Sequence, residues 1–151
     1  MQKKCGIILF NEETNEFLLV YGKKSNKWGF PKGHNEQGET EIETATREFL
    51  EETGYTIDIN QFSWNRKFKI KNNIYFELNI KNKDSLFLKY KEIPDQNEIL
   101  KLDWFHKDSI NKIDFNNCNL GLRNWILRNK FLKYNNNDEL IKKKIVKKIE
   151  I

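Results

Sequence analysis

The stretch GHNEQGETEIETATREFLEETGY, residues 33–55, carries the clearest structural signal in the chain. It predicts a glycine-bearing loop that runs into one amphipathic helix. Thr40 is a favourable N-cap residue, and Glu43, three positions later, completes the capping-box pattern. Gly54 follows the last helical turn, where a left-handed residue commonly ends a helix.

The two faces of this predicted helix carry different side chains. Apolar residues recur at helical spacing on the face that we expect to meet the core: Ile42, Ala45 and Phe49. The other face carries Glu48, Glu51 and Glu52, three and four residues apart. Like charges at this spacing repel each other by roughly 0.2–0.5 kcal/mol per pair, so a cation is expected beside them.

Two kinds of cation suit this acidic face. Carboxylate oxygens are good ligands for hard divalent cations, and Mg²⁺ in proteins usually takes one or two carboxylates together with water and phosphate oxygens. Arg47 adds a fixed positive charge that can grip a carboxylate with two hydrogen bonds. For the E-x-x-E-E pattern taken alone, the alternative is a solvated acidic helix face.

Composition limits the class of protein. The 151 residues suffice for one domain with a real core, and we expect a single domain over 1–151. Neither an apolar run of membrane-spanning length nor a signal-peptide pattern is present, which predicts a cytoplasmic protein with no membrane partner. The formal charge of +5 is compatible with a polyanionic substrate, but Lys and Asn are abundant throughout.

The rest of the chain predicts strands before and after the acidic helix and further helices at the end. Alternating or continuous apolar patterns indicate strands at 5–10, 16–21, 56–60, 62–69, 74–80 and 85–90. A helix is expected at 120–132, then a break at 134–137 and a basic amphipathic helix at 138–149, so that about 135–151 forms a basic C-terminal tail. The basic face of this tail is either solvated or directed to RNA.

The 33–55 stretch resembles the Nudix box. Every fixed position of that pattern is met, and only Tyr55 stands where an aliphatic residue is usual. The matching residues are Gly33, Glu39, Arg47, Glu48, Phe49, Glu51, Glu52 and Gly54. The resemblance implies an α/β fold, a Nudix-type α/β/α sandwich with a mixed sheet and C-terminal helices. It also implies hydrolysis of a nucleoside diphosphate linked to another group.

The resemblance implies roles for these residues. Mg²⁺ or Mn²⁺ would be bound by Glu48, Glu51 and Glu52 together with the Gly33 carbonyl. Arg47 would hold the glutamates in place, and Glu39 would support them from outside the metal's own ligands. For the base that activates water three candidates stay open, namely Glu51, Glu52 and Glu98, because Glu98 lies in a loop before a strand that ends in Trp-Phe, as in many Nudix proteins.

The segment before the box bears on the substrate. The run W-x-x-P-K-G-H, residues 28–34, is similar to asymmetric diadenosine-tetraphosphate hydrolases and to messenger-RNA decapping enzymes. Lys32 and His34 are candidate phosphate or substrate contacts, or else ordinary loop residues. Among the aromatic residues that follow, Phe68 and Tyr75 are the candidates for stacking on a base, although most of these rings are expected in the core.

The predicted substrate is a dinucleoside polyphosphate such as diadenosine tetraphosphate. The alternatives are a capped RNA, from which 7-methyl-GDP would be released, and more remotely nucleoside triphosphates or diphosphoinositol phosphates. A catalytically silent module that binds nucleotide or RNA is a further alternative of another class. The sequence leaves the oligomeric state open.

Overall fold

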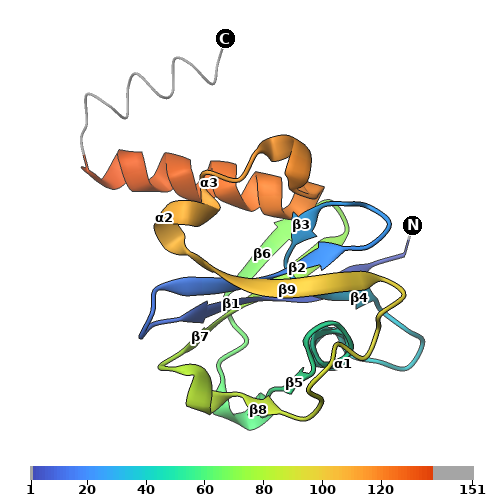
Figure 1. Ribbon diagram of the computed structural model, residues 1–151. Helices are drawn as coiled ribbons and strands as arrows, with labels where there is room; N and C mark the ends of the chain where they lie inside the picture. The colour runs from blue at the N-terminus through green and yellow to red at the C-terminus, as the bar shows by residue number, and fades with distance from the viewer. Residues whose placement is uncertain (1, 138–151) are drawn as a thin grey trace.

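The computed structural model describes residues 2–137, with side chains up to residue 129. Three helices cover the two faces of a central sheet (Figure 1): α1 (Glu41–Thr53), α2 (Lys107–Ile110) and α3 (Leu120–Asn137). The strands are β1 (Lys4–Asn11), β2 (Glu16–Gly22), β3 (Trp28–Gly29), β4 (Lys32–His34), β5 (Tyr55–Thr56), β6 (Lys67–Ile70), β7 (Asn73–Ile80), β8 (Phe87–Leu88) and β9 (Ile99–His106). Short 3-10 turns lie at Ile59–Gln61, Lys83–Ser85 and Phe115–Asn117.

The main sheet is mixed. Its path runs β3-β2-β1-β7-β6, while β4 also pairs with β1 and β9 also pairs with β2. Strands β1 and β7 are parallel, and the other pairs of this sheet are antiparallel. Strands β5 and β8 form a separate two-stranded sheet. The predicted α/β class and mixed sheet are therefore confirmed. Among the described helices, none has both the length and the apolar character of a membrane span.

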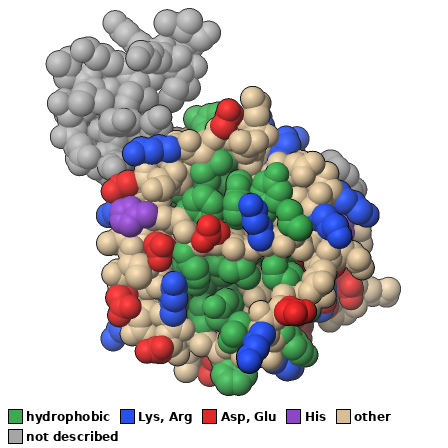
Figure 2. All heavy atoms as spheres, in the orientation of Figure 1, with side chains coloured by type: hydrophobic (Ala, Val, Ile, Leu, Met, Phe, Trp, Pro, Cys, Tyr) green, Lys and Arg blue, Asp and Glu red, His purple; other side chains and the backbone are tan. Residues whose placement is uncertain are grey.

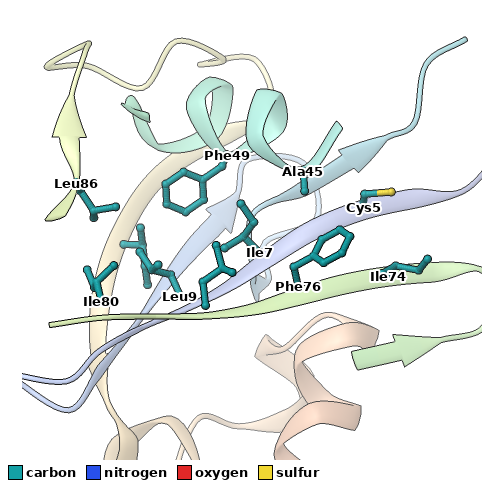
Figure 3. Close-up of a cluster of buried hydrophobic side chains, with 11 residues drawn as sticks. Cys5, Ile7, Leu9, Ala45, Phe49, Ile74, Phe76, Ile80 and Leu86 are labelled. Carbon is teal, nitrogen blue, oxygen red and sulfur yellow. The ribbon is translucent and has the colours of Figure 1, made fainter. Parts of the chain in front are cut away.

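Each face of the sheet has its own core, which gives the three-layer arrangement in Figure 1. On one face, Ala45 and Phe49 of α1 point toward Ile7 and Leu9 of β1 (Figure 3). On the other face, the buried residues of α3 pack over the sheet and include Leu122, Trp125 and Ile126. The α1 layer fixes the acidic face of that helix relative to β4.

Helix α1 begins and ends where the sequence predicts. The Thr40 side chain accepts a hydrogen bond from the Glu43 amide, and the Glu43 side chain accepts one from the Thr40 amide, which completes the capping box. Gly54 has φ 84° and ψ −5°, so it takes the left-handed conformation, and its amide donates to the Leu50 carbonyl.

Four predictions of secondary structure need correction, and one of them is the strand over 85–90, which forms only at Phe87–Leu88. The predicted strand over 62–69 forms only at Lys67–Ile70, and the one over 56–60 is reduced to Tyr55–Thr56. The intervening chain turns instead, because the Asp58 side chain accepts from the Asn60 amide and the Trp64 indole donates to the Ile59 carbonyl. The predicted break at 134–137 is wrong, since α3 continues through Asn137. The predicted helix at 138–149 lies outside the described residues.

Candidate active site

Strand β4 and helix α1 meet at Gly33. Antiparallel pairing with β1 sets Gly33 opposite Cys5, and the carboxylate of Glu48 from α1 lies directly against the Gly33 backbone. A Cβ atom at residue 33 would collide with the Glu48 carboxylate, so the close approach needs glycine here.

Arg47 joins the surrounding carboxylates. Its Nε donates to Glu39 Oε2 at 2.7 Å, and its Nη1 donates to Glu48 Oε1 at 2.9 Å and to Glu51 Oε1 at 3.2 Å. Its Nη2 donates to the His34 carbonyl at 3.0 Å. The hydrogen bonds from Arg47 lower the pKa of Glu39 to about 2. Arg47 therefore ties the loop before α1 to the acidic face of the helix.

Glu48 and Glu52 are buried, with only 7% and 4% of their surfaces exposed. Burial is the main cause that raises the pKa of Glu48 to about 7, and the neighbouring Glu51 charge adds to it. Burial also raises the pKa of Glu52 to about 8, although Glu52 Oε1 accepts a hydrogen bond from the Lys32 amide at 3.1 Å. Both side chains would be more stable as carboxylates beside an additional cation.

Glu98 and Lys32 approach this buried pair from other elements. The charge of Glu98, which immediately precedes β9, contributes to the raised pKa values of both Glu48 and Glu52. Burial is the largest of the causes that lower the pKa of Lys32. The structure thus brings together residues that lie far apart in the sequence.

One functional support was missed by the sequence analysis. The Asp95 amide donates to the Glu51 carbonyl at 2.9 Å, which anchors the 89–98 segment to the end of α1. Asp95 Oδ1 in turn accepts from the Glu98 amide at 3.3 Å. The Asp-x-x-Glu spacing at 95–98 indicates the local turn, whereas the bond to the Glu51 carbonyl is a contact between distant segments that the spacing does not indicate.

Two of the proposed substrate contacts do not fit the structure. Phe68 and Tyr75 are buried in the core between the sheet and α3. Because neither ring offers an open face to a base, we do not retain them as stacking residues. The exposed side chain of His34 remains free to meet a ligand, while its carbonyl is bonded to Arg47.

The donor set fits a divalent cation. Within the described residues, no three His, Cys, Asp or Glu side chains form a ready-made metal cluster, and Glu48 and Glu51 are instead paired with Arg47. The ligands nevertheless have the right chemistry, since they are hard carboxylate oxygens partly removed from water. The gap left by Gly33 also brings its backbone within reach of the Glu48 carboxylate.

Comparison with known proteins agrees with this geometry. The model of the NUDIX domain matches residues 2–125. The chain belongs to the Nudix family. The Nudix match covers the whole sheet, α1 and the beginning of α3, so all the site residues above lie within it.

The Nudix relatives fall into two groups. Over 115 residues the chain is 30% identical to the m7GpppN-mRNA hydrolase of Saccharomyces cerevisiae, a match that covers 71% of this chain and 11% of the relative. Over 61 residues it is 41% identical to the asymmetrical bis(5'-nucleosyl)-tetraphosphatase of Mus musculus, covering 34% of this chain and 42% of the relative. The chain therefore matches less than half the length of either relative.

A solved structure shares the fold. The NUDIX hydrolase from Nitrosomonas europaea superposes with a TM-score of 0.66 at 17% identity and covers 87% of this chain and 89% of its own. At 17% identity, this similarity shows that the two proteins share a fold.

Proposed function

We propose that the protein is a metal-dependent hydrolase of a phosphoanhydride bond in a nucleoside-diphosphate-linked substrate. The observation that carries this proposal is the buried pair Glu48 and Glu52, whose pKa values are both raised. Glu48 lies against Gly33, and Glu52 accepts a hydrogen bond from the Lys32 amide. Burying two carboxylates costs free energy, and a module that only binds nucleotide has no need of them. The geometry therefore favours catalysis over silent binding.

The proposed ligands for Mg²⁺ or Mn²⁺ are Glu48, Glu51, Glu52 and the Gly33 carbonyl. When bound by these residues, the cation would neutralise charge on the phosphate oxygens and would lower the pKa of bound water. Arg47 keeps the carboxylates oriented, and Glu39 fixes Arg47 in turn. Lys32, beside Glu52, is proposed to contact a phosphate oxygen.

We propose Glu98 as the base that receives the proton of the attacking water. Glu51 is engaged by Arg47, and Glu52 is buried and bonded to the Lys32 amide. Glu98 is exposed, and within the described part of the chain its carboxylate makes neither an ion pair nor a hydrogen bond. Its carboxylate is therefore the one left free to take a proton.

Two substrates compete, each favoured by a different observation. The run Pro31-Lys32-Gly33-His34 favours a dinucleoside polyphosphate, which the tetraphosphatase relatives are named for. The match to the m7GpppN-mRNA hydrolase extends over more than twice as much of this chain. We therefore place capped RNA first and the dinucleoside polyphosphate second, which reverses the order suggested by the 31–34 run alone.

The test is hydrolysis of both substrates side by side with Mg²⁺. Release of 7-methyl-GDP from cap-labelled RNA is expected. If the protein instead releases ATP from diadenosine tetraphosphate and does not cleave the capped RNA, the dinucleoside polyphosphate returns to first place.

Glu52→Gln removes a proposed metal ligand and should reduce turnover by at least about 100-fold with the fold intact. Glu13→Gln, an exposed glutamate in the β1–β2 turn, is the matched control and should keep full activity. Equal activity of the two variants would contradict the proposal.

A further inference from the structure

A pocket of about 500 Å³ opens beside the catalytic cluster, between the first half of β9 and the 89–98 segment. Nothing in the mechanism above uses it. Its volume lies within the range of small-molecule sites in proteins. Its lining combines aliphatic side chains with several polar ones, a mixture that small-molecule sites also have.

The apolar part of the lining is open to solvent. Leu88 of β8 is 46% exposed and Leu100 of β9 is 57% exposed, and both line the pocket together with Ile93 and Tyr55. Figure 2 shows hydrophobic side chains over the centre of this face, in its upper as well as its lower half, and Figure 1 places β8 and the 89–98 segment below β9. A ligand with an apolar face would cover this surface.

The polar part of the lining suits a phosphorylated ligand. Lys23 and Lys91 line the pocket, and neither belongs to an ion pair among the described residues. The Gln96 amide nitrogen donates to Glu92 Oε2 at 3.2 Å, so the Gln96 carbonyl oxygen is held in place as an acceptor. Charge and hydrogen-bonding groups therefore lie beside the apolar wall.

The pocket is lined by neighbours of the proposed catalytic residues. The Lys23 amide donates to the Glu98 carbonyl at 2.8 Å, and Ile99, next in sequence to Glu98, lines the pocket. On the helix side, Thr53 lines the pocket and follows Glu52 directly. The pocket wall therefore adjoins the chain segments that carry Glu98 and Glu52.

We propose that this pocket binds a purine nucleoside of the substrate, with Lys23 and Lys91 on the adjoining phosphates. The proposal rests on the proposed function, because both candidate substrates end in a purine nucleoside. The aliphatic wall of Leu88 and Leu100 covers the face of the base, and Gln96 accepts from its edge. The polyphosphate leads from there to the metal ligands.

The experiment is a titration of the metal-free full chain with AMP, GMP and adenosine, followed by ¹H–¹⁵N NMR. These ligands contain no phosphoanhydride, so the result is independent of hydrolysis. Chemical shift changes are expected at Thr53, Gln96 and Leu100. Leu100→Ser should weaken AMP binding about tenfold. Lys91→Gln should weaken AMP binding but leave adenosine binding unchanged, because it removes only a phosphate contact.

Leu127→Ser is the matched control, because Leu127 is a similarly exposed leucine, 48% accessible, on α3 away from the pocket. It should bind AMP like the unmodified chain. Absence of binding, shifts confined to other surfaces, or equal affinity of Leu100→Ser and Leu127→Ser would overturn the pocket assignment. If the unmodified chain binds AMP in the pocket but hydrolyses neither candidate substrate, the result would count against the proposed function alone.

Discussion

At the scale of single residues, Gly33 shows how one missing side chain shapes the site. Its backbone lies where the Glu48 carboxylate packs, and no other residue leaves that space. The glutamate spacing on α1 and the capping pattern are local features, so the sequence alone predicts that Glu48, Glu51 and Glu52 share a face. The contact between Gly33 and Glu48 depends on the pairing of β4 with β1, and the spacing of residues along the sequence does not reveal that pairing.

Gly33→Ala should therefore reduce hydrolysis by about 100-fold, because the added methyl group would have to displace the Glu48 carboxylate by roughly 1 Å or more. Steady-state kinetics measures the loss, and circular dichroism checks that the fold is kept. Gly38→Asn is the control, since residue 38 lies in the same loop with a positive φ and no atom within 4 Å of its Cβ position. Equal activity of both variants would refute this account of Gly33.

The two aromatic residues show what residue patterns leave undetermined. Alternation places Phe68 and Tyr75 on a face of the sheet, but it does not say that α3 covers that face. The covering helix comes some fifty residues later in the chain. For this reason the sequence offers both rings as stacking candidates, whereas the structure has both of them buried.

At the scale of elements, α1 is specified almost entirely by its own sequence. Its capping box, its apolar face and its C-terminal glycine all agree, and the helix forms over Glu41–Thr53. The 56–69 region lacks this agreement. Side-chain hydrogen bonds of Asp58 and Trp64 to nearby backbone groups compete with strand pairing there, so alternation alone overestimates the strands.

Thr40→Ala should destabilise the protein by about 1 kcal/mol, because it removes the side-chain oxygen that accepts from the Glu43 amide. Urea denaturation measures the change in the free energy of unfolding. Thr46→Ala, within the same helix, should stay within about 0.5 kcal/mol of the unmodified chain, since Thr46 caps no helix end. A larger loss for Thr46→Ala than for Thr40→Ala would refute the importance of the cap.

At the scale of the whole molecule, the sheet separates two cores with different tasks. The core under α1 orients the carboxylates, and the core under α3 supports the sheet from behind. Strand β9 and the 89–98 segment then carry Glu98 to the same cluster. This convergence from separate elements is a property of topology, so the sequence could suggest Glu98 only through a family resemblance.

Leu122→Ala should destabilise the protein by about 2–5 kcal/mol, because Leu122 is fully buried between α3 and the sheet. Thermal unfolding measures the loss, and kinetics below the unfolding transition should change little, since the site lies on the other face. Leu127→Ala on the exposed side of α3 is the control and should have a small effect. Comparable destabilisation by the two variants would contradict this placement of α3.

The central claim is that the acidic face of α1, together with Gly33, binds a divalent cation. The most direct measurement is Mn²⁺ binding to the full chain, followed by the loss of the free-ion EPR signal, with Glu48→Gln, Glu52→Gln and the control Glu13→Gln in parallel. The account predicts saturable binding to the unmodified chain and to Glu13→Gln, and at least about tenfold weaker binding to the other two variants. Absence of binding to the unmodified chain, or equal affinity in all four proteins, would contradict it.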